Sequence, residues 1–214
     1  MEIYRLIFSP IAVNTYILAD KSGKCAVIDC GCFDDDEFER LVEFMDSKNL
    51  QPHLLLNTHS HMDHIFGNKR FLGKYNLKPF CHSEEGMNRG NAIQYAGYFG
   101  LEMEDPPPPA GYLSDGETVS FGSETLLALH VPGHAPESLA FYSEKDKAVF
   151  TGDALFAGSI GRSDIPGGDH LQLIQNIKRK LFVLPPDTIV YPGHGETTTI
   201  ENEMKNNPYF RYGK

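Results

Sequence analysis

The sequence predicts an α/β protein in which strands and helices alternate along the whole chain. Short apolar or alternating segments, bounded by glycine, proline and asparagine, recur as expected of strands. Segments with apolar residues at helical spacing lie between them. No linker divides the 214 residues, so we expect a single domain over residues 1–214 with one hydrophobic core.

The N-terminal part of the chain predicts strands and one helix. The strands are expected at residues 4–7, 14–19, 25–29 and 54–56. A helix is expected over residues 34–48, where Phe38, Leu41, Val42 and Met45 recur at helical spacing. Acidic residues crowd the start of this segment, where the helix dipole favours negative charge.

In the middle of the chain, a helix is expected to begin within residues 58–64 and to end near Asn76. Residues 83–100 predict a further helix, and the proline run at 106–109 forces an extended loop after it.

Beyond the proline run, strands are expected at residues 126–131, 139–142, 148–151 and 188–191. Asp169 can cap a helix before the last of these strands, with apolar residues from Leu173 to Leu181 on its buried face.

Charge and composition exclude several partners. The formal net charge is −10 and the basic residues are scattered, which argues against a nucleic-acid partner. The basic run 178–180 predicts a solvated helix face. The sequence begins without a basic and apolar leader, and no apolar run approaches the roughly 20 residues of a membrane span. We therefore expect a cytoplasmic protein without a membrane anchor. No feature predicts the oligomeric state.

The four cysteines lack the paired spacing of a zinc finger, and we expect buried free thiols at Cys25, Cys30, Cys32 and Cys81. A metal or redox pair at Cys30 and Cys32 is the alternative.

Four predicted strands are each followed at once by side chains that can bind a metal. These side chains are His59, His61, Asp63 and His64 after the strand at 54–56, then His134, Asp153 and His194 after three later strands. Sites in α/β proteins gather beyond strand ends, where loops converge. Imidazole and carboxylate ligands suit zinc, and also iron or manganese. Flanking glycines would let the backbone turn the later ligands inward.

The cluster at residues 58–64 is the strongest of these signals. In an extended segment His59 and His61 project to the same side and can bind one ion together, while Asp63 and His64 point to a second. Such a density of imidazole and carboxylate is hard to explain as packing, because buried polar groups need partners. A Pro-Gly-His turn like that at His194 is, taken alone, more often structural. The histidines without such context are expected to be structural or exposed: His53, His82, His130 and His170.

The pattern His59-x-His61-x-Asp63-His64, followed by His134, Asp153 and His194, resembles the ligand set of the metallo-β-lactamase superfamily. The resemblance extends from the strand at 26–29 to His194. It implies a four-layer αββα sandwich with metal ions at one edge. It also implies that His59, His61 and His134 bind one ion, that Asp63, His64 and His194 bind a second, and that Asp153 bridges them. Asp29 would support the loop that presents the ligands, with an ordinary strand-end cap as the alternative.

Two further stretches narrow the resemblance within the superfamily. Residues 130–138 and 151–164 resemble the branch of glyoxalase II and the persulfide dioxygenases. Flavin-linked diiron oxygen reductases have Glu at the place of His61, and β-lactamases lack the Gly-Arg-Ser-Asp stretch at 161–164. Persulfide dioxygenases carry a different sequence around their last histidine and bind one iron, whereas residues 192–196 leave His194 free for a second site. Arg162 and Asp164 are expected to form an internal ion pair that braces their loop.

The resemblance implies a hydrolase with two divalent metal ions, zinc before iron or manganese. A hydroxide bridging the ions would attack a carbonyl carbon, and Asp63 would orient it as the catalytic residue. A thiolate leaves without prior protonation, whereas an amide nitrogen needs a general acid that the sequence does not offer. We therefore expect a small-molecule thioester substrate such as S-lactoylglutathione. The alternatives are a mononuclear iron persulfide dioxygenase, a lactonase or phosphodiesterase of the same fold, and a non-catalytic binding protein, which would have lost a ligand.

The sequence departs from glyoxalase II after His194. Residues 195–214 follow, so we expect this protein to lack the C-terminal helical domain that helps to bind glutathione, and we expect the tail to form at most a short helix around 200–206. Glutathione specificity therefore stays open. A substitute pocket wall is expected at residues 91–103, with Tyr95, Tyr98 and Phe99; packing in the core is the alternative for these aromatics.

Overall fold

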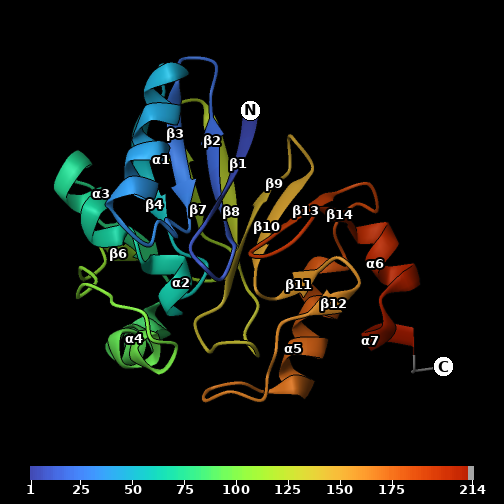
Figure 1. Cartoon of the computed structure of the whole chain (residues 1–214). Helices are drawn as coiled ribbons and strands as arrows, with labels where there is room; N and C mark the ends of the chain where they lie inside the picture. Colours follow the sequence, from blue (N-terminus) through green and yellow to red (C-terminus); the bar gives the residue numbers. More distant parts are fainter. Residues whose placement is uncertain (212–214) are drawn as a thin grey trace.

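The computed structural model describes residues 1–211, apart from the side chains of residues 86–88. Two six-stranded sheets lie face to face, and helices cover the outer face of each (Figure 1). This arrangement confirms the αββα sandwich expected from the sequence. Within the described residues, none of the helices combines the length and apolar character needed to cross a membrane.

The first sheet is antiparallel at one edge and parallel at the other. Its strands, in spatial order, are β1 (Glu2–Phe8), β2 (Val13–Ala19), β3 (Lys24–Ile28), β4 (Gln51–Leu56), β5 (Pro79–Cys81) and β6 (Gly111–Tyr112). β1, β2 and β3 are antiparallel neighbours, while β3 to β6 run parallel. Parallel neighbours need crossover connections, and these supply the helices α1 to α4.

The second sheet is mostly antiparallel. Its spatial order is β14 (Thr198–Thr199), β13 (Ile189–Pro192), β10 (Ala148–Gly152), β9 (Leu139–Ser143), β8 (Glu124–His130) and β7 (Thr118–Phe121). β10 and β13 are parallel, and the connection between them contains the small hairpin β11 (Leu155–Phe156) and β12 (Ser159–Ile160) and a helix.

The described residues form seven α-helices. They are α1 (Asp35–Ser47), α2 (Met62–Ile65), α3 (Asn68–Tyr75), α4 (Gly86–Tyr98), α5 (His170–Asn176), α6 (Ile200–Asn206) and α7 (Pro208–Arg211). A 3₁₀ turn at Ser83–Glu85 precedes α4, and a π-helical turn at Ile177–Leu181 extends α5. Figure 1 shows α1 and α3 on one side of the sandwich and α5 and α6 on the other.

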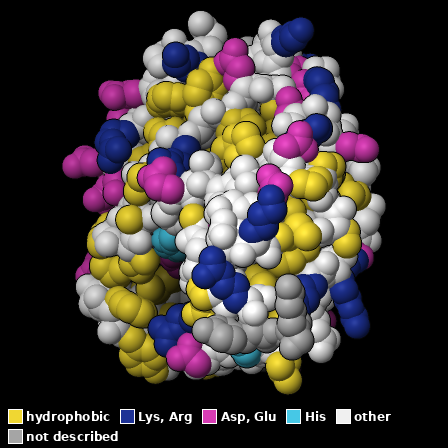
Figure 2. Space-filling model, turned by 90° about the vertical axis from the view of Figure 1, so that its right-hand side faces the viewer, with side chains coloured by type: hydrophobic (Ala, Val, Ile, Leu, Met, Phe, Trp, Pro, Cys, Tyr) yellow, Lys and Arg dark blue, Asp and Glu magenta, His cyan; other side chains and the backbone are white. Residues whose placement is uncertain are grey.

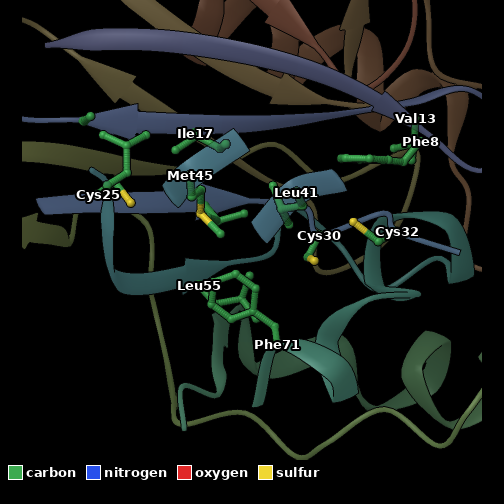
Figure 3. Close-up of a cluster of buried hydrophobic side chains, with 13 residues drawn as sticks. Phe8, Val13, Ile17, Cys25, Cys30, Cys32, Leu41, Met45, Leu55 and Phe71 are labelled. Atoms are coloured by element: carbon green, nitrogen blue, oxygen red, sulfur yellow. The ribbon is translucent and has the colours of Figure 1, made fainter. Parts of the chain in front are cut away.

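α1 illustrates why these segments become helices. The carboxylate of Asp34 accepts a hydrogen bond from the backbone N–H of Glu37 at 2.8 Å, so it caps the helix as the acidic start of the segment suggests. Leu41 and Met45 are fully buried on the inner face of the helix. They pack with residues of the first sheet and with α3 in the cluster of Figure 3. The free cysteines Cys25, Cys30 and Cys32 belong to the same cluster, and Cys81 is buried as well, as expected.

The main core lies between the two sheets. Tyr16 and Ile28 of the first sheet are buried against Phe141 and Phe150 of the second. A third cluster fills the space between the second sheet and α5. Each apolar face of the two sheets is therefore covered, and the loops beyond the strand ends stay available for a site.

We expected one continuous helix up to Asn76, and this prediction was wrong. The helix is divided into α2 and α3 at Gly67, whose backbone N–H donates to the carbonyl of Cys30 at 2.8 Å rather than continuing the helix. A Cβ at Gly67 would lie 2.5 Å from the Cys30 sulfur, so only glycine allows this contact. The tail also exceeds the expectation, because α7 follows α6, with Pro208 at its first position.

Candidate metal centre

The predicted ligands come together at one edge of the sandwich. They lie beyond the ends of four strands, namely His59 after β4, His134 after β8, Asp153 after β10 and His194 after β13, with His61, Asp63 and His64 at the start of α2. The strand ends meet at this edge, which is why side chains far apart in sequence become neighbours.

His59, His61 and His134 form one group of donor atoms. One ligand atom from each lies within 4.8 Å of the others. His134 Nε2 and His61 Nδ1 are 2.9 Å apart. All three side chains are mostly or fully removed from solvent. Three imidazole nitrogens that converge in this way match one tetrahedral metal position that leaves a place for water or substrate.

Asp63, His64 and His194 form a second group. Their ligand atoms also lie within 4.8 Å of one another. His194 Nε2 is 3.1 Å from Asp63 Oδ2, and His64 Nε2 is 3.6 Å from the same oxygen. A carboxylate with two imidazoles is again a donor set for zinc, iron or manganese.

Asp153 lies between the two groups. Its Oδ1 is 3.3 Å from His64 Nε2, and its Oδ2 is 3.7 Å from His134 Nε2 and from His194 Nε2. Together with His59 and His64 it forms a further set of donors within 4.8 Å. One carboxylate therefore reaches both imidazole groups, as a bridging ligand must.

The outward-facing nitrogens of four histidines have hydrogen-bond partners, and these partners fix the tautomers. His134 Nδ1 donates to the carbonyl of Arg162 at 2.8 Å, and His194 Nδ1 donates to the carbonyl of Ala12 at 3.2 Å. A carbonyl only accepts, so Nδ1 carries the proton and Nε2 presents its lone pair to the centre. This is the arrangement that orients metal-binding histidines.

Asp29 organises the other two of these histidines. Its Oδ2 accepts a hydrogen bond from His64 Nδ1 at 2.8 Å and another from the Thr58 hydroxyl at 2.7 Å, while its Oδ1 accepts from the Thr58 backbone N–H. The Thr58 hydroxyl in turn lies 3.1 Å from His59 Nδ1, which can donate to it. Asp29 adopts φ 54°, a left-handed conformation that costs energy in most residues. This single carboxylate thereby connects ligands of both groups.

Buried atoms without partners test whether this site fits metal ions. Seven side-chain nitrogen or oxygen atoms of the described residues are buried without a hydrogen bond, and three of them belong to the predicted ligands, namely His59 Nε2, His64 Nε2 and Asp153 Oδ1. Folded proteins rarely leave such atoms unsatisfied, because each costs about 1–3 kcal/mol. Donor atoms of these three residues lie within 4.8 Å of one another, so cations held in the two groups would satisfy them. The donor set therefore fits metal ions.

The electrostatics differ between the two groups. Burial holds the pKa of His59 well below its usual value and lowers the pKa of His61 to about 3, so both imidazoles are neutral, the form that binds metal. Burial also acts to lower the pKa of His64, but the carboxylates of Asp153, Asp63 and Asp29 outweigh it and raise that pKa well above the usual value. Asp153 and its neighbours thus create a place that favours positive charge.

Two glycines allow the loops to approach closely. A Cβ on Gly193 would lie 2.2 Å from Asp153 Oδ1 and 2.7 Å from His64 Cε1. Gly152 adopts φ 50°, and a Cβ there would lie 2.4 Å from the Thr58 hydroxyl. Any larger residue at either position would push a proposed ligand or its supporting group aside.

A pocket of 560 Å³ opens onto the centre. His61, Asp63, His134, Asp153 and His194 line its inner part. The expected wall at 91–103 is present in part, since Tyr95 and Phe99 line the pocket but Tyr98 is not among the lining residues.

Arg162 also lines the pocket and forms the ion pair expected with Asp164. Arg162 Nε lies 3.0 Å from Asp164 Oδ1, and Arg162 Nη2 lies 3.2 Å from Asp164 Oδ2.

The sequence pattern predicts no role for Thr58, Glu137 or the backbone carbonyls of Ala12 and Arg162, yet all four contact the candidate ligands or their loop. Glu137 is fully buried, and its Oε1 accepts a hydrogen bond at 3.1 Å from the backbone N–H of Ser60, between His59 and His61. The signal for it was an acid three residues after His134 in a stretch otherwise free of charge. Backbone carbonyls leave no signal in a sequence.

The remaining histidines lie outside this centre. The rings of His82 and His130 stack with centroids 3.9 Å apart and planes at 11°. His130 and Glu84 offer donor atoms near those of His82, but the parallel rings cannot both direct lone pairs at one ion without rotating. His53 Nδ1 donates to the carbonyl of Gln51 at 2.9 Å, and the ring of His170 lies near that of Tyr209.

Known proteins share this fold over nearly its whole length. The sequence-family model of the metallo-beta-lactamase superfamily matches residues 9–194. The chain is 33% identical over 198 residues to hydroxyacylglutathione hydrolase GloC of Haemophilus influenzae, a match that covers 92% of each protein. It is 31% identical to BLEG-1 B3 metallo-beta-lactamase, with a TM-score of 0.88 and coverage of 98% of this chain and 100% of the other. It is 35% identical to TTHA1623, solved in a di-iron-bound form, with a TM-score of 0.87 and coverage of 96% and 99%.

Proposed function

Because this chain belongs to the metallo-β-lactamase superfamily, we propose that it is a hydrolase that holds two divalent metal ions and cleaves a thioester. The observation that supports this most strongly is the pair of donor groups joined by Asp153. His59, His61 and His134 would hold one ion, and Asp63, His64 and His194 the other.

Bound metal ions would supply an activated water and an electrophile for the substrate carbonyl. The protein's own residues position the reactants. Asp63 lines the pocket, and its Oδ2 lies 3.1 Å from His194 Nε2 within the second donor group, so Asp63 is placed to orient the attacking water. Asp29 and Thr58 keep His59 and His64 in the tautomer that faces the centre.

The chemistry of the pocket favours a thiol leaving group. Apart from the proposed ligands, the described lining residues include no carboxyl or imidazole group that could protonate an amine as it leaves. A thiolate, with a pKa of about 8.5, leaves without such help. The similarity to a hydroxyacylglutathione hydrolase over 92% of both chains supports the same class. S-lactoylglutathione is therefore the first substrate to test.

The nature of the ions is part of the proposal. Nitrogen and oxygen donors suit zinc, iron and manganese alike. Zinc is our first choice because the proposed reaction needs no redox change. The alternative of a single-iron persulfide dioxygenase leaves the second donor group, and His194 within it, without a role.

The deciding experiment measures thiol release from S-lactoylglutathione by protein of known metal content. We expect turnover with two ions per chain, and a loss of at least about 100-fold in His61→Ala, since even groups that only support a ligand contribute up to that much. Two kinds of assay run in parallel. One measures oxygen uptake with glutathione persulfide, and the other measures hydrolysis of a lactone, a phosphodiester and a chromogenic β-lactam. Turnover of one of these without thioester cleavage would replace the proposal.

A further inference from the structure

We propose that this site selects thioesters whose acyl group is apolar and uncharged, an inference that rests on the thioester hydrolysis proposed above. The pocket has two unlike parts. The inner part holds the groups of the candidate metal centre, and the outer part is a wall of apolar side chains.

The apolar wall is assembled from separate segments of the chain. Its residues are Ile11 from the turn between β1 and β2, Met62 from α2, Tyr95 and Phe99 from α4 and the residue after it, Phe156 from β11, and Ile165 and Pro166 from the loop before α5. Figure 2 shows a hollow with hydrophobic side chains along much of its rim, a histidine above it and a basic side chain below it. The volume of 560 Å³ is in the range of pockets that bind small molecules.

Charge in the pocket argues against a polyanionic substrate group within it. Arg162 is the one arginine or lysine among the described lining residues, and Asp164 accepts hydrogen bonds from Arg162 Nε and Nη2. The carboxylates of glutathione would lose hydration inside the pocket, where Asp164 already partly neutralises this one arginine. A charged thiol group therefore stays at the solvent side, and the acyl group occupies the apolar wall.

α4 places two adjacent aromatic residues in different environments at the pocket mouth. Phe99 lines the pocket and still has 67% of its surface exposed, whereas Tyr98 is 71% exposed and is not a lining residue. The helix is anchored by Ala92 and Ala96, which pack against Met62 and its neighbours on α2. Phe99 is thus an apolar surface that a ligand can cover, on a helix that does not depend on it for packing.

The test measures kcat/KM for the butanoyl, hexanoyl and octanoyl thioesters of N-acetylcysteamine, a small neutral thiol. S-lactoylglutathione is measured alongside them, and the protein contains two metal ions per chain. Each added methylene that the wall buries is expected to raise kcat/KM about fourfold. S-lactoylglutathione is expected to fall below the hexanoyl and octanoyl thioesters.

Phe99→Ala and Tyr98→Ala form a matched pair for the same series. Phe99→Ala is expected to reduce the gain per methylene to less than about twofold, because the acyl chain loses the surface that covers it. Tyr98→Ala is expected to keep the wild-type gain. Metal content and melting temperature check that both variants fold, and the high exposure of both side chains makes loss of the fold an unexpected result.

The outcomes separate the two proposals. If the two-metal protein hydrolyses none of the thioesters, the proposed function and this inference are both overturned. If S-lactoylglutathione is hydrolysed at least as well as the octanoyl thioester and the series is flat, thioester hydrolysis stands and the apolar selectivity is wrong. If Phe99→Ala and Tyr98→Ala keep the same gain per methylene, the wall does not seat the acyl chain.

Discussion

At the scale of single residues, the supporting contacts of the candidate metal centre are as specific as its ligands. Asp29 contacts Thr58 and His64, and through the Thr58 hydroxyl it reaches His59. The ligand types could be predicted from the sequence, because three histidines and an aspartate within six positions are a density of metal-binding groups that packing alone does not require. The roles of the Ala12 and Arg162 carbonyls could not be predicted from the sequence, because every residue has a carbonyl.

Asp29→Asn tests the first of these contacts. Asparagine tolerates the left-handed conformation at φ 54° and keeps the size of the side chain, so the fold is expected to persist. Without the negative charge, His64 is a weaker ligand, and we expect the affinity for metal to fall about 10- to 100-fold. Competition with a chromogenic chelator measures it. Asp36→Asn, on the exposed face of α1, is the control, and equal affinities in the two variants would show that Asp29 has no supporting role.

Glu137 gives a second test at this scale. Glu137→Ala removes the acceptor for the Ser60 N–H and leaves a buried donor unsatisfied, so we expect the free energy of unfolding to fall by about 1–3 kcal/mol. Glu137→Gln keeps a carbonyl oxygen at the same place and is expected to lose less. Urea denaturation of the metal-loaded protein compares them. Equal losses would mean that the charge of Glu137, and not this hydrogen bond, is what the protein needs.

At the scale of elements, segments with several turns or alternations were predictable and short ones were not. β2, β8 and β10 have five or more residues and show their pattern, whereas β5, β6 and β14 have two or three and cannot. The break between α2 and α3 depends on the contact of Gly67 with Cys30, which is distant in sequence. Local patterns do not contain such tertiary contacts.

Gly193→Ala tests how closely the loop after β13 must approach the centre. The added methyl would lie 2.2 Å from Asp153 Oδ1, so we expect Asp153 to be displaced and thioester hydrolysis to fall by at least about 100-fold. Gly73→Ala is the control, because a Cβ there meets nothing within 4 Å in the middle of α3. It is expected to stabilise the protein by up to about 1 kcal/mol and to keep full activity. Full activity in Gly193→Ala would contradict the tight packing of this loop.

At the scale of the whole molecule, the centre joins both sheets. β4 belongs to the first sheet, and β8, β10 and β13 belong to the second, so ions held by ligands after these strands would tie the sheets together. The sandwich and its layers followed from the sequence through the order of elements and the resemblance of the ligand pattern. The shape of the pocket wall did not, because it combines short segments from distant parts of the chain.

Removal of the metal ions is therefore expected to lower the melting temperature. Ligands that bind only the folded state stabilise it by about 4 kcal/mol at a thousand times their dissociation constant. Calorimetry before and after treatment with a strong chelator measures the change. The control is His61→Ala, in which the chelator is expected to cause a smaller change. A wild-type melting temperature that the chelator does not alter would show that metal binding is not coupled to folding.

Anomalous diffraction from crystals of the metal-loaded protein locates the ions and so tests whether the chain binds two metals at this centre. We expect two peaks, one surrounded by His59, His61 and His134 and the other by Asp63, His64 and His194, with Asp153 between them. A single peak within the first group, with His194 turned away from it, would contradict the two-metal hydrolase and favour single-iron chemistry.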